Sequence, residues 1–544
     1  MAAKKIMIQG TMSNSGKSFL TAALCRIFWQ DGYRTAPFKS QNMALNSYIT
    51  ADGLEIGRAQ AMQAEAAGIE PAVEMNPILL KPTSHMGSQV IVNGEVAGNW
   101  KAMDYYRRKP EFIPVIQKAF ARLEEQYEVI VLEGAGSPAE INLRENDIVN
   151  MGMAKLADAP VLLVGDIDRG GVFASLYGTV MLLSLQERAR IKGLVINKFR
   201  GDIKILEPGL LMLEELLKIP VVGVIPMEEI DLDDEDSLSE RLVQGKGALQ
   251  GADCEEKWRE IGILDFAVIS LPHISNFTDF HVLERIPEVR LRYVKKVGEL
   301  GNPDLILLPG TKNTMADLTW LREGGLESAI LRQVKEEQSM VIGICGGYQM
   351  LGEKLSDPEG VEGLAGGVIR GMGLLPAETI FSGQKTRTQI KGRLLEKSRM
   401  FAEFSGEAVT GYEIHMGLTR MVGEKMVGEN KDSCMWSICL EDGRKDGMER
   451  GDGRVFGSYL HGLFDNEKLT EALLQRLTEE KGLKYCPKPK WSVADYKEQQ
   501  YDKLAKLVRQ SLDMKRIYEI LMEHQEQKEI KHVETDRMDF SKGN

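Results

Sequence analysis

The sequence lacks the features of a membrane-bound or secreted protein. No apolar run in its 544 residues approaches the roughly 20 that a membrane-spanning helix needs. The chain passes from Lys4 and Lys5 directly into a short strand-like segment, without the long apolar core of a signal peptide. None of its six cysteines forms a C-x-x-C pair, which argues against a zinc site and a disulfide framework. We therefore expect a cytoplasmic protein with no membrane partner.

An excess of positive charge is also missing. The sequence has 68 lysines and arginines against 80 aspartates and glutamates, a formal net charge of −12. Nucleic-acid-binding proteins usually carry a basic surface, so we expect small-molecule substrates and no nucleic-acid partner. An acidic chain can still bind anions through local loops, helix N-termini and individual lysines. The sequence gives no indication of an oligomeric state.

The hydrophobic pattern predicts an α/β fold. Short, continuous apolar runs alternate with helical stretches, which is typical of strands buried on both faces of a parallel sheet. A second series of the same kind begins near Phe266. We therefore predict two doubly wound domains, whose ligands bind at the carboxyl ends of the strands. The expected strands are residues 6–10, 129–134, 161–166, 193–197, 221–226, 266–270, 305–310, 341–345 and 455–460.

An acidic segment that also contains glycines separates the two series. Residues 231–260 include the acidic run 233–236 and the sequence GKG at 245–247, and we interpret them as a linker. The acidic run is interpreted as a solvated face in preference to a metal site. The last residues are polar and have little to bury, so a disordered tail is expected. The predicted parts are residues 1–230, the linker 231–260, residues 261–470, a helical extension 471–522 and the tail 523–544.

Residues 10–18 (GTMSNSGKS) have the layout of a phosphate-binding P-loop, because a strand precedes them and a helical stretch follows. The backbone N–H groups of such a loop encircle a phosphate. Lys17 is expected to neutralise phosphate charge and Ser18 to bind Mg²⁺. Five residues separate the two glycines where the standard pattern has four, and a plain structural turn is the alternative. We predict that the nucleotide contacts Gly10, Ser15, Gly16, Lys17 and Ser18.

Polar residues at other strand ends are further candidates for the same site. Glu133 ends a predicted buried strand, where a carboxylate can hold Mg²⁺ or orient reacting groups. Asp52 is a second Mg²⁺ candidate, and Asn197 is expected to place its amide against a nucleotide base. Each has a structural alternative: a helix cap or turn for Glu133, and a turn for Asp52 and Asn197.

A cysteine occupies the centre of a second motif. Residues 343–347 (GICGG) follow a predicted strand and lead into a helical stretch, which is the pattern of a nucleophile elbow with cysteine in place of serine. A helix N-terminus favours the thiolate form of Cys345. The N–H groups of Gly346 and Gly310 are the expected donors to an oxyanion. The alternative is an ordinary buried cysteine.

A nucleophilic cysteine needs a base, and the sequence has seven histidines. We favour His461, because it directly follows the predicted strand 455–460, so that Cys345 and His461 are expected to meet at one sheet edge. The competitor is His415.

These residues resemble class I glutamine amidotransferases. The segment 308–314 (LPGTKNT), the Cys345 elbow and the strand before His461 occur in that family's order. The resemblance implies a flavodoxin-like sheet and hydrolysis of glutamine at Cys345. Class I domains usually carry Glu two residues after the histidine, but this chain has Leu463 there, so the resemblance is to the subgroup built on Cys and His without that Glu. What orients His461 is left open.

The first half resembles the dethiobiotin-synthetase-like P-loop enzymes, whose phosphate loop also has the extra residue. These enzymes use ATP and Mg²⁺ to activate a carboxylate. The two halves in this order are similar to the cobalamin-pathway amidotransferases. The matching motifs are residues 38–47 (FKSQNMALNS), 75–82 (MNPILLKP), 133–140 (EGAGSPAE) and 166–173 (DIDRGGVF), with His85 as a departure where an acid is expected.

The resemblance implies an ATP-dependent ligase that acts on a corrinoid carboxylate. ATP would convert the carboxylate into an acyl phosphate, and ammonia from glutamine would replace the phosphate. The implied products are the amides at positions b, d, e and g of adenosylcobyrinic acid a,c-diamide, and the two active sites are expected to face one another or share a tunnel. Alternatives are a,c-diamide synthesis on the earlier corrinoid, an ATP-dependent switch that binds a partner, and a glutaminase that supplies ammonia to another protein.

Overall fold

The computed structural model describes residues 3–84, 87–233, 263–336, 338–363, 366–422, 433–483 and 492–522. Most of the expected linker, the expected tail and His85 lie outside these residues. The chain divides into two compact units. Unit 1 comprises residues 1–44, 55–233 and 496–544, and unit 2 comprises residues 45–54 and 234–495. None of the helices in the described ranges is both long and apolar enough to cross a membrane.

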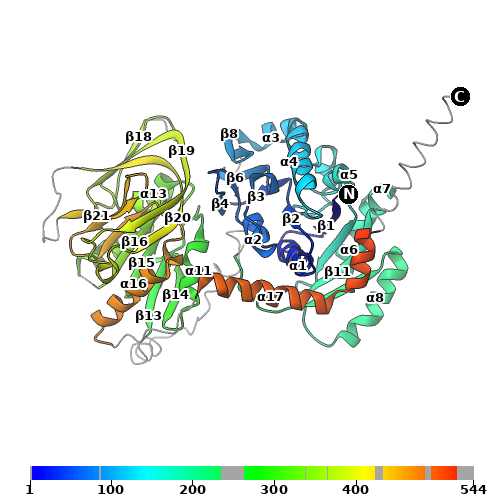
Figure 1. Ribbon diagram of the computed structural model, residues 1–544. Helices are drawn as coiled ribbons and strands as arrows, with labels where there is room; N and C mark the ends of the chain where they lie inside the picture. The colour runs from blue at the N-terminus through cyan, green and yellow to red at the C-terminus, as the bar shows by residue number, and fades with distance from the viewer. Residues whose placement is uncertain are drawn as a thin grey trace. The chain divides into compact units, whose positions relative to one another are not determined.

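Unit 1 is built on a six-stranded sheet in which every neighbouring pair is parallel (Figure 1). Along β1 the side chains alternate between the two faces. Ile6 and Ile8 pack into one apolar core, whereas Met7 packs into the other. The sheet is therefore buried on both sides, as its apolar strands predict. In spatial order the strands are β12 (Val221–Pro226), β11 (Ile191–Phe199), β10 (Val161–Asp166), β1 (Lys4–Gly10), β9 (Val129–Glu133) and β2 (Thr35–Phe38).

Helices cover this sheet. Among the described residues, the helices of unit 1 include α1 (Lys17–Gln30), α2 (Arg58–Ala66), α3 (Ala102–Arg108), α4 (Ile113–Gln126), α5 (Met151–Ala157), α6 (Val172–Leu182), α7 (Leu185–Arg188) and α8 (Ile203–Leu217). Helix α17 (Val493–Ser511) begins in unit 2 and continues in unit 1, where Tyr501, Leu504 and Val508 pack into the core that contains α1. The apolar face of α17 is therefore buried within unit 1.

Unit 1 also has a smaller four-stranded sheet, whose strands are β3 (Gln41–Met43), β6 (Ile78–Ser84), β7 (Gly87–Val92) and β8 (Glu95–Lys101). Two short strands, β4 (Ser47–Ile49) and β5 (Glu55–Gly57), lie at either end of the segment that belongs to unit 2. The motif at residues 38–47 thus contributes to both units.

Unit 2 is built on an eleven-stranded sheet, of which one part is parallel and the other is mainly antiparallel (Figure 1). The parallel strands, in spatial order, are β14 (Val289–Val294), β13 (Leu264–Ile269), β15 (Leu305–Leu308), β16 (Met340–Ile344) and β23 (Val455–Ser458). The remaining strands are β22 (Lys445–Arg450), β21 (Cys434–Leu440), β19 (Ala377–Leu394), β20 (Ala408–Met421), β17 (Lys354–Asp357) and β18 (Gly367–Arg370). The helices in its described residues are α11 (His281–Glu284), α12 (Val297–Leu300), α13 (Thr314–Glu323), α14 (Leu326–Lys335), α15 (Gly346–Leu351) and α16 (Glu467–Glu480).

The prediction of an α/β fold with two parallel-sheet domains is confirmed, and all nine expected strands are present within a few residues of their predicted ends. The interpretation of the acidic run was wrong at one residue. Asp233 was expected on a solvated face, but it is buried and forms an ion pair with Arg58 of α2. A carboxylate that has a guanidinium partner can be buried at tolerable cost, which a count of acidic residues does not reveal.

Candidate active sites

The phosphate loop of unit 1 meets Glu133 because two neighbouring strands are parallel. β1 and β9 lie side by side with Ile8 opposite Glu133, so the loop after β1 and the end of β9 share one sheet edge. Ser18 Oγ donates a hydrogen bond to Glu133 Oε1 at 2.8 Å. Lys17 Nζ donates to the carbonyl oxygens of Met12 at 2.9 Å and Gly136 at 3.3 Å. The structure therefore brings the predicted P-loop to Glu133, which was predicted from a different strand.

The loop has no room for side chains at its two glycines. Gly16 has a φ of 94°, and a Cβ atom there would lie 2.0 Å from Asn197 Nδ2. A Cβ atom at Gly10 would lie 2.1 Å from Ser15 Oγ. Ser15 Oγ is buried, and within the described chain it has no hydrogen-bond partner. An unpaired buried hydroxyl is costly, so this one fits a loop built to close around a ligand.

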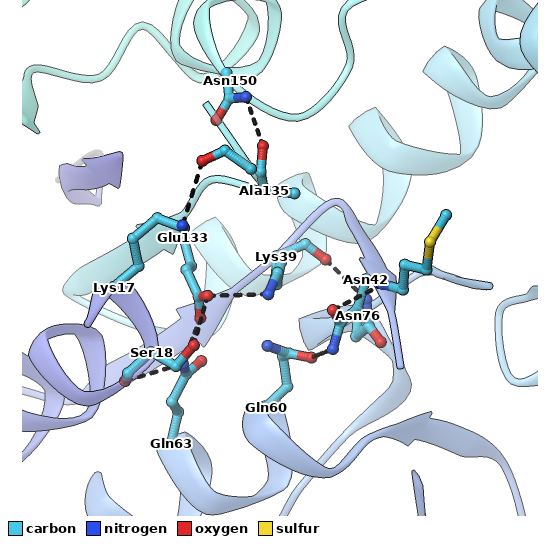
Figure 2. Close-up of polar contacts among 12 residues, drawn as sticks. Lys17, Ser18, Lys39, Asn42, Gln60, Gln63, Asn76, Glu133, Ala135 and Asn150 are labelled. Atoms are coloured by element: carbon cyan, nitrogen blue, oxygen red, sulfur yellow. Dashed lines mark hydrogen bonds and ion pairs between the residues drawn. The ribbon is translucent and has the colours of Figure 1, made fainter. Parts of the chain in front are cut away.

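Two further residues contact the Glu133 carboxylate (Figure 2). Neither was predicted as a site residue. Lys39 Nζ forms an ion pair with Glu133 Oε1 at 2.9 Å, and Gln63 Nε2 donates to Oε2 at 2.6 Å. Lys39 and Glu133 are both buried. Lys39 thus brings a second positive charge to the edge that Lys17 occupies. Its only signal in the sequence was its place in the motif at residues 38–47, where a lysine follows a strand.

A layer of buried amides surrounds this cluster (Figure 2). Asn42 Nδ2 donates to Gln60 Oε1 at 3.0 Å, and Asn76 Nδ2 donates to the carbonyl oxygen of Lys39 at 3.0 Å. Asn150 Nδ2 donates to the carbonyl oxygen of Ala135 at 2.7 Å. Within the described residues, three polar atoms of this layer are buried without a partner: Gln60 Nε2, Gln63 Oε1 and Asn150 Oδ1. Several unpaired polar atoms gathered beside one P-loop fit a site for a polar ligand.

A pocket of about 150 Å³ adjoins the phosphate loop. Gly16, Asn197, Lys198 and Glu228 line part of it, and apolar side chains form the rest. Asn197 Nδ2 donates to the carbonyl oxygen of Ser15 at 2.9 Å, so this amide stabilises the phosphate loop. Its contact with a nucleotide base stays a prediction. The apolar lining residues are Phe19, Leu20, Ile225, Pro226, Met227, Ile230, Leu504, Leu507 and Val508.

The two candidate carboxylates for Mg²⁺ have different surroundings. Glu133 contacts Ser18, and a serine hydroxyl beside a carboxylate offers the hard oxygen ligands that Mg²⁺ prefers. Asp52 belongs to unit 2 and accepts a hydrogen bond from Thr50 Oγ1. The described residues contain no group of three or more His, Cys, Asp or Glu side chains placed to hold a metal. A pair of oxygen ligands that leaves places for water and phosphate is typical of Mg²⁺ bound together with a nucleotide.

In unit 2, Cys345 lies at the tip of a tight turn. It directly follows β16 and has φ 52° and ψ −108°, a backbone conformation that non-glycine residues rarely adopt. Close backbone packing makes the turn possible. A Cβ atom at Gly347 would lie 2.1 Å from the carbonyl oxygen of Leu308, and one at Gly343 would lie 2.6 Å from that of Gly347. The glycines are therefore required by the fold, and they hold the cysteine in the strained position of a nucleophile elbow.

His461 lies beside Cys345, because β16 and β23 are parallel neighbours and both residues lie just beyond the strand ends. His461 Nδ1 lies 2.7 Å from Asp279 Oδ2, and the backbone N–H of Gly462 donates to Asp279 Oδ1 at 3.1 Å. Asp279 lies 182 residues before His461 and was not predicted from the sequence. The only local sign was an aspartate soon after a predicted strand.

The protonation of His461 is controlled by its neighbours. Burial alone would lower the pKa of His461, but the charge and hydrogen bond of Asp279, together with a hydrogen bond to Cys345, outweigh burial and raise it to about 10. His461 therefore favours the imidazolium form. A cation beside a cysteine is the arrangement that suits a nucleophilic cysteine.

His415, the competing base, has a different environment. Burial lowers the pKa of His415 to about 3, so its ring stays neutral. Its Nδ1 lies 3.1 Å from the carbonyl oxygen of Gly417, and its ring stacks on Tyr459 with centroids 3.6 Å apart. His415 follows Ile414, whose carbonyl oxygen accepts a hydrogen bond from Cys345 Sγ at 3.5 Å. It therefore lies near the nucleophile, but its low pKa makes it a poorer proton acceptor than His461.

The two expected oxyanion glycines lie in the same neighbourhood. A Cβ atom at Gly310 would lie 3.3 Å from His461 Cε1, and one at Gly346 would lie 3.0 Å from the backbone nitrogen of Thr311. The loop after β15 and the start of α15 thus pack against each other next to Cys345 and His461. Their function as oxyanion donors stays a prediction.

Comparison with known proteins links both sites to one family. Residues 6–238 match the CobQ/CobB/MinD/ParA nucleotide binding domain, and residues 265–469 match the CobB/CobQ-like glutamine amidotransferase domain. A protein of Lachnoclostridium phytofermentans named cobyric acid synthase is 55% identical over 529 residues, covering 96% of this chain and 99% of the relative. The chain belongs to the cobyric acid synthase family.

Two further members of the cobyric acid synthase family are similar over nearly their whole length. The protein of Ruminiclostridium cellulolyticum is 54% identical and covers 96% of this chain and 98% of its own. That of Alkaliphilus metalliredigens is 52% identical and covers 95% of this chain and 99% of its own. The resemblance to cobalamin-pathway amidotransferases, with a nucleotide-binding half and a glutamine amidotransferase half, is confirmed.

Proposed function

We propose that this protein is a cobyric acid synthase, which uses ATP and glutamine to amidate the b, d, e and g carboxylates of adenosylcobyrinic acid a,c-diamide. One observation carries the proposal: a single chain holds both a Cys345–His461 pair and a P-loop whose Ser18 contacts Glu133. The first pair suits release of ammonia from glutamine, and the second suits activation of a carboxylate by ATP. Near-full-length similarity to the cobyric acid synthase family supplies the substrate class.

The glutaminase half uses unit 2. The Cys345 thiolate attacks the side-chain amide carbon of glutamine, and a tetrahedral intermediate forms whose oxyanion is stabilised by the backbone N–H groups of Gly310 and Gly346. His461 gives its proton to the leaving nitrogen, so ammonia departs and a glutamyl thioester stays on Cys345. His461, now neutral, takes a proton from water as the water attacks the thioester. Glutamate is released, and the thiolate–imidazolium pair is restored.

The synthetase half uses unit 1. The corrinoid carboxylate attacks the γ-phosphorus of ATP, ADP leaves, and an acyl phosphate forms. Lys17 and Lys39 offset the negative charge that develops on the transferring phosphoryl group. Mg²⁺, which we assign to Ser18 and Glu133 together with the phosphates, supplies Lewis-acid stabilisation when bound. Ammonia then attacks the acyl carbon, and phosphate leaves.

The pocket beside the P-loop suits the base of the nucleotide. Gly16 belongs both to the phosphate loop and to the pocket wall, so a nucleotide that places its phosphates in the loop has its base beside the pocket. The apolar side chains of Leu504, Leu507 and Val508 offer a surface on which a planar base can be buried. We therefore assign part of the ATP site to helix α17.

Mass spectrometry of the corrinoid tests this function directly. Each conversion of a carboxyl group to an amide lowers the mass by about one unit. With ATP, Mg²⁺ and glutamine, adenosylcobyrinic acid a,c-diamide should show four successive losses. Two losses on cobyrinic acid, and none on the a,c-diamide, would instead assign the protein to a,c-diamide synthesis. ATP hydrolysis stimulated by a macromolecule, without any change in either corrinoid, would favour a partner-binding switch.

A further inference from the structure

We infer that Asp279 is the positioning residue of the glutaminase site: it fixes the proton and orientation of His461 in place of the glutamate that class I amidotransferases usually carry two residues after the histidine. The inference rests on the proposed function, because it assigns a role within glutamine hydrolysis. It goes beyond that function by naming the group that makes His461 competent.

The geometry of Asp279 is that of a fixed acceptor. One carboxylate oxygen lies 2.7 Å from His461 Nδ1, and the other accepts the backbone N–H of Gly462 at 3.1 Å. Both oxygens therefore hold the same segment, one through its ring and one through its backbone. Asp279 is 5% exposed and His461 is 1% exposed, so water competes little for either group. An acceptor on Nδ1 keeps the proton of a neutral ring there and leaves Nε2 as the basic nitrogen.

The residue that stands where class I amidotransferases usually carry glutamate cannot orient His461. Leu463 lies two residues after His461, and its apolar side chain is fully buried in the core of unit 2. Asp279 comes instead from the short 3₁₀ helix Phe277–Phe280, which follows β13 at the same sheet edge. The turn before it contains Asn276 in a left-handed conformation with φ 50°, and Asp279 N donates to the carbonyl oxygen of Asn276 at 3.1 Å. The carboxylate is thus presented by a defined turn.

The other groups around His461 do not duplicate Asp279. The ring of Tyr412 stacks on His461 with centroids 5.2 Å apart, and its hydroxyl donates to the carbonyl oxygen of Ser47 at 3.3 Å. Cys345 contacts the imidazole as its reaction partner, and His415 interacts with it as a neighbouring ring. Among these described neighbours, Asp279 is the carboxylate that is hydrogen-bonded to the ring. Its negative charge stabilises the imidazolium that forms when Cys345 is a thiolate.

The variant Asp279→Asn separates a positioning function from a structural one. The amide oxygen of asparagine can still accept the N–H of Gly462, so the shape and one hydrogen bond are kept. Its NH₂ group, however, would face Nδ1 as a donor, and this places the ring proton on Nε2, where a base must be free. A structural function predicts that this near-isosteric change is mild. A positioning function predicts a loss of glutamine-dependent amidation of about 100-fold or more, in kcat rather than in KM for glutamine.

The test combines two readouts on the full-length protein. The first is amidation of the corrinoid with glutamine or with ammonium chloride as the nitrogen source. The second is the pH dependence of Cys345 alkylation by iodoacetamide, which reports the thiolate without any corrinoid or ATP. Asp265→Asn is the matched control, because Asp265 lies on β13 and pairs with Arg292, away from His461. Asp279→Glu tests whether a carboxylate from a longer side chain restores part of the effect.

We expect Asp279→Asn to keep ammonia-dependent amidation and to move the alkylation midpoint to higher pH, because the imidazolium no longer stabilises the thiolate. Asp265→Asn should match the unmodified protein in both readouts, and Asp279→Glu should give values between those of Asp279→Asn and the unmodified protein. An unchanged alkylation profile and kcat in Asp279→Asn would overturn the inference. If Asp279→Asn, but neither of the other variants, loses ammonia-dependent amidation, the substitution has damaged the fold, and this result would also contradict the inference. If the unmodified protein amidates no corrinoid, the proposed function fails, whereas the alkylation profiles still decide on Asp279.

Discussion

Ser18 Oγ lies 2.8 Å from Glu133 Oε1, although 115 residues separate the two in the chain. The contact follows from the pairing of β1 with β9, which places the P-loop and a strand-end carboxylate at one sheet edge. Lys39 joins them from the position directly after the strand β2, which pairs with the other side of β9. Three adjacent parallel strands thus deliver a hydroxyl, a carboxylate and an ammonium group to one place.

Lys39 should be needed for carboxylate activation. We expect Lys39→Met to lower ATP-dependent amidation about 100-fold or more with either nitrogen source, because a buried cation is lost where phosphoryl charge develops. The matched control is Lys5→Met, since Lys5 is also a buried, ion-paired lysine of this sheet but pairs with Glu124. Steady-state amidation assays of both variants decide the matter. Equal effects of the two substitutions would indicate that Lys39 matters only for stability.

Cys345 should be needed for glutamine but not for ammonia. Cys345→Ala removes the nucleophile and leaves the unit 1 site unchanged, so glutamine-dependent amidation should be abolished while ammonia-dependent amidation stays close to normal. Cys439→Ala is the control, because Cys439 is a free, partly exposed cysteine on β21. A Cys345→Ala protein that fails with both nitrogen sources would contradict the division of chemistry between the two sites.

Helix α17 should contribute to nucleotide affinity. Leu507→Ser removes an apolar side chain from the pocket wall, and we expect the KM for ATP to rise about tenfold, which corresponds to about 1.4 kcal/mol. Lys506→Ser introduces the same residue at an exposed neighbouring position and should leave the KM unchanged. Glutamine hydrolysis at saturating substrate should be unaffected in both. A normal KM in Leu507→Ser would remove α17 from the proposed site.

The Mg²⁺ requirement should depend on Ser18. In Ser18→Ala, we expect the Mg²⁺ concentration for half-maximal amidation to rise several-fold, because one oxygen ligand is lost. Asp52→Asn tests the second predicted carboxylate ligand. A rise of similar size in that variant would confirm that Asp52 contributes to the metal site, whereas an unchanged requirement would leave Ser18 and Glu133 as the protein ligands.

Glutamine hydrolysis should persist to alkaline pH. The pKa of His461 is raised to about 10, so the imidazolium that protonates the leaving ammonia survives far above the ordinary histidine value of 6.5. The rate should therefore fall only as the pH approaches that raised value. Because the pKa is higher in the folded protein, the pair also stabilises the fold fully below pH 6.5 and loses this effect as pH rises toward about 10. A glutaminase rate that already falls as the pH rises past 6.5 would show that His461 is not held as imidazolium.

Local sequence patterns were enough to select most of the candidate site residues. The P-loop and the cysteine elbow are contiguous motifs, and Glu133 and His461 lie at the ends of apolar strands. The hydrophobic pattern does not reveal the order of the strands in the sheet. That these residues lie close together was therefore an expectation until the structure was known. The structure brings Ser18 to Glu133 and His461 to Cys345.

Residues that act from another element were missed. Lys39 directly follows β2, and Asp279 lies in the short 3₁₀ helix Phe277–Phe280 after β13. Nothing in their immediate neighbours distinguishes them from a surface lysine and a turn aspartate. Their importance comes from strand pairing with β9 and from the course of the chain after β13, which are long-range features. The strands β17 to β22, whose pairing is mainly antiparallel, were also missed. Their half-buried alternation is a weaker signal than the continuous apolar runs of the parallel strands.

The central claim is that nitrogen from glutamine reaches the corrinoid through an ATP-dependent reaction within this one protein. The most direct test incubates the protein with adenosylcobyrinic acid a,c-diamide, ATP, Mg²⁺ and glutamine labelled with ¹⁵N in its side-chain amide, followed by mass spectrometry. We predict four new amides, each about one mass unit heavier than the amide formed from unlabelled glutamine, and no product without ATP. Unlabelled amides, or no amides with ATP and glutamine present, would contradict the account.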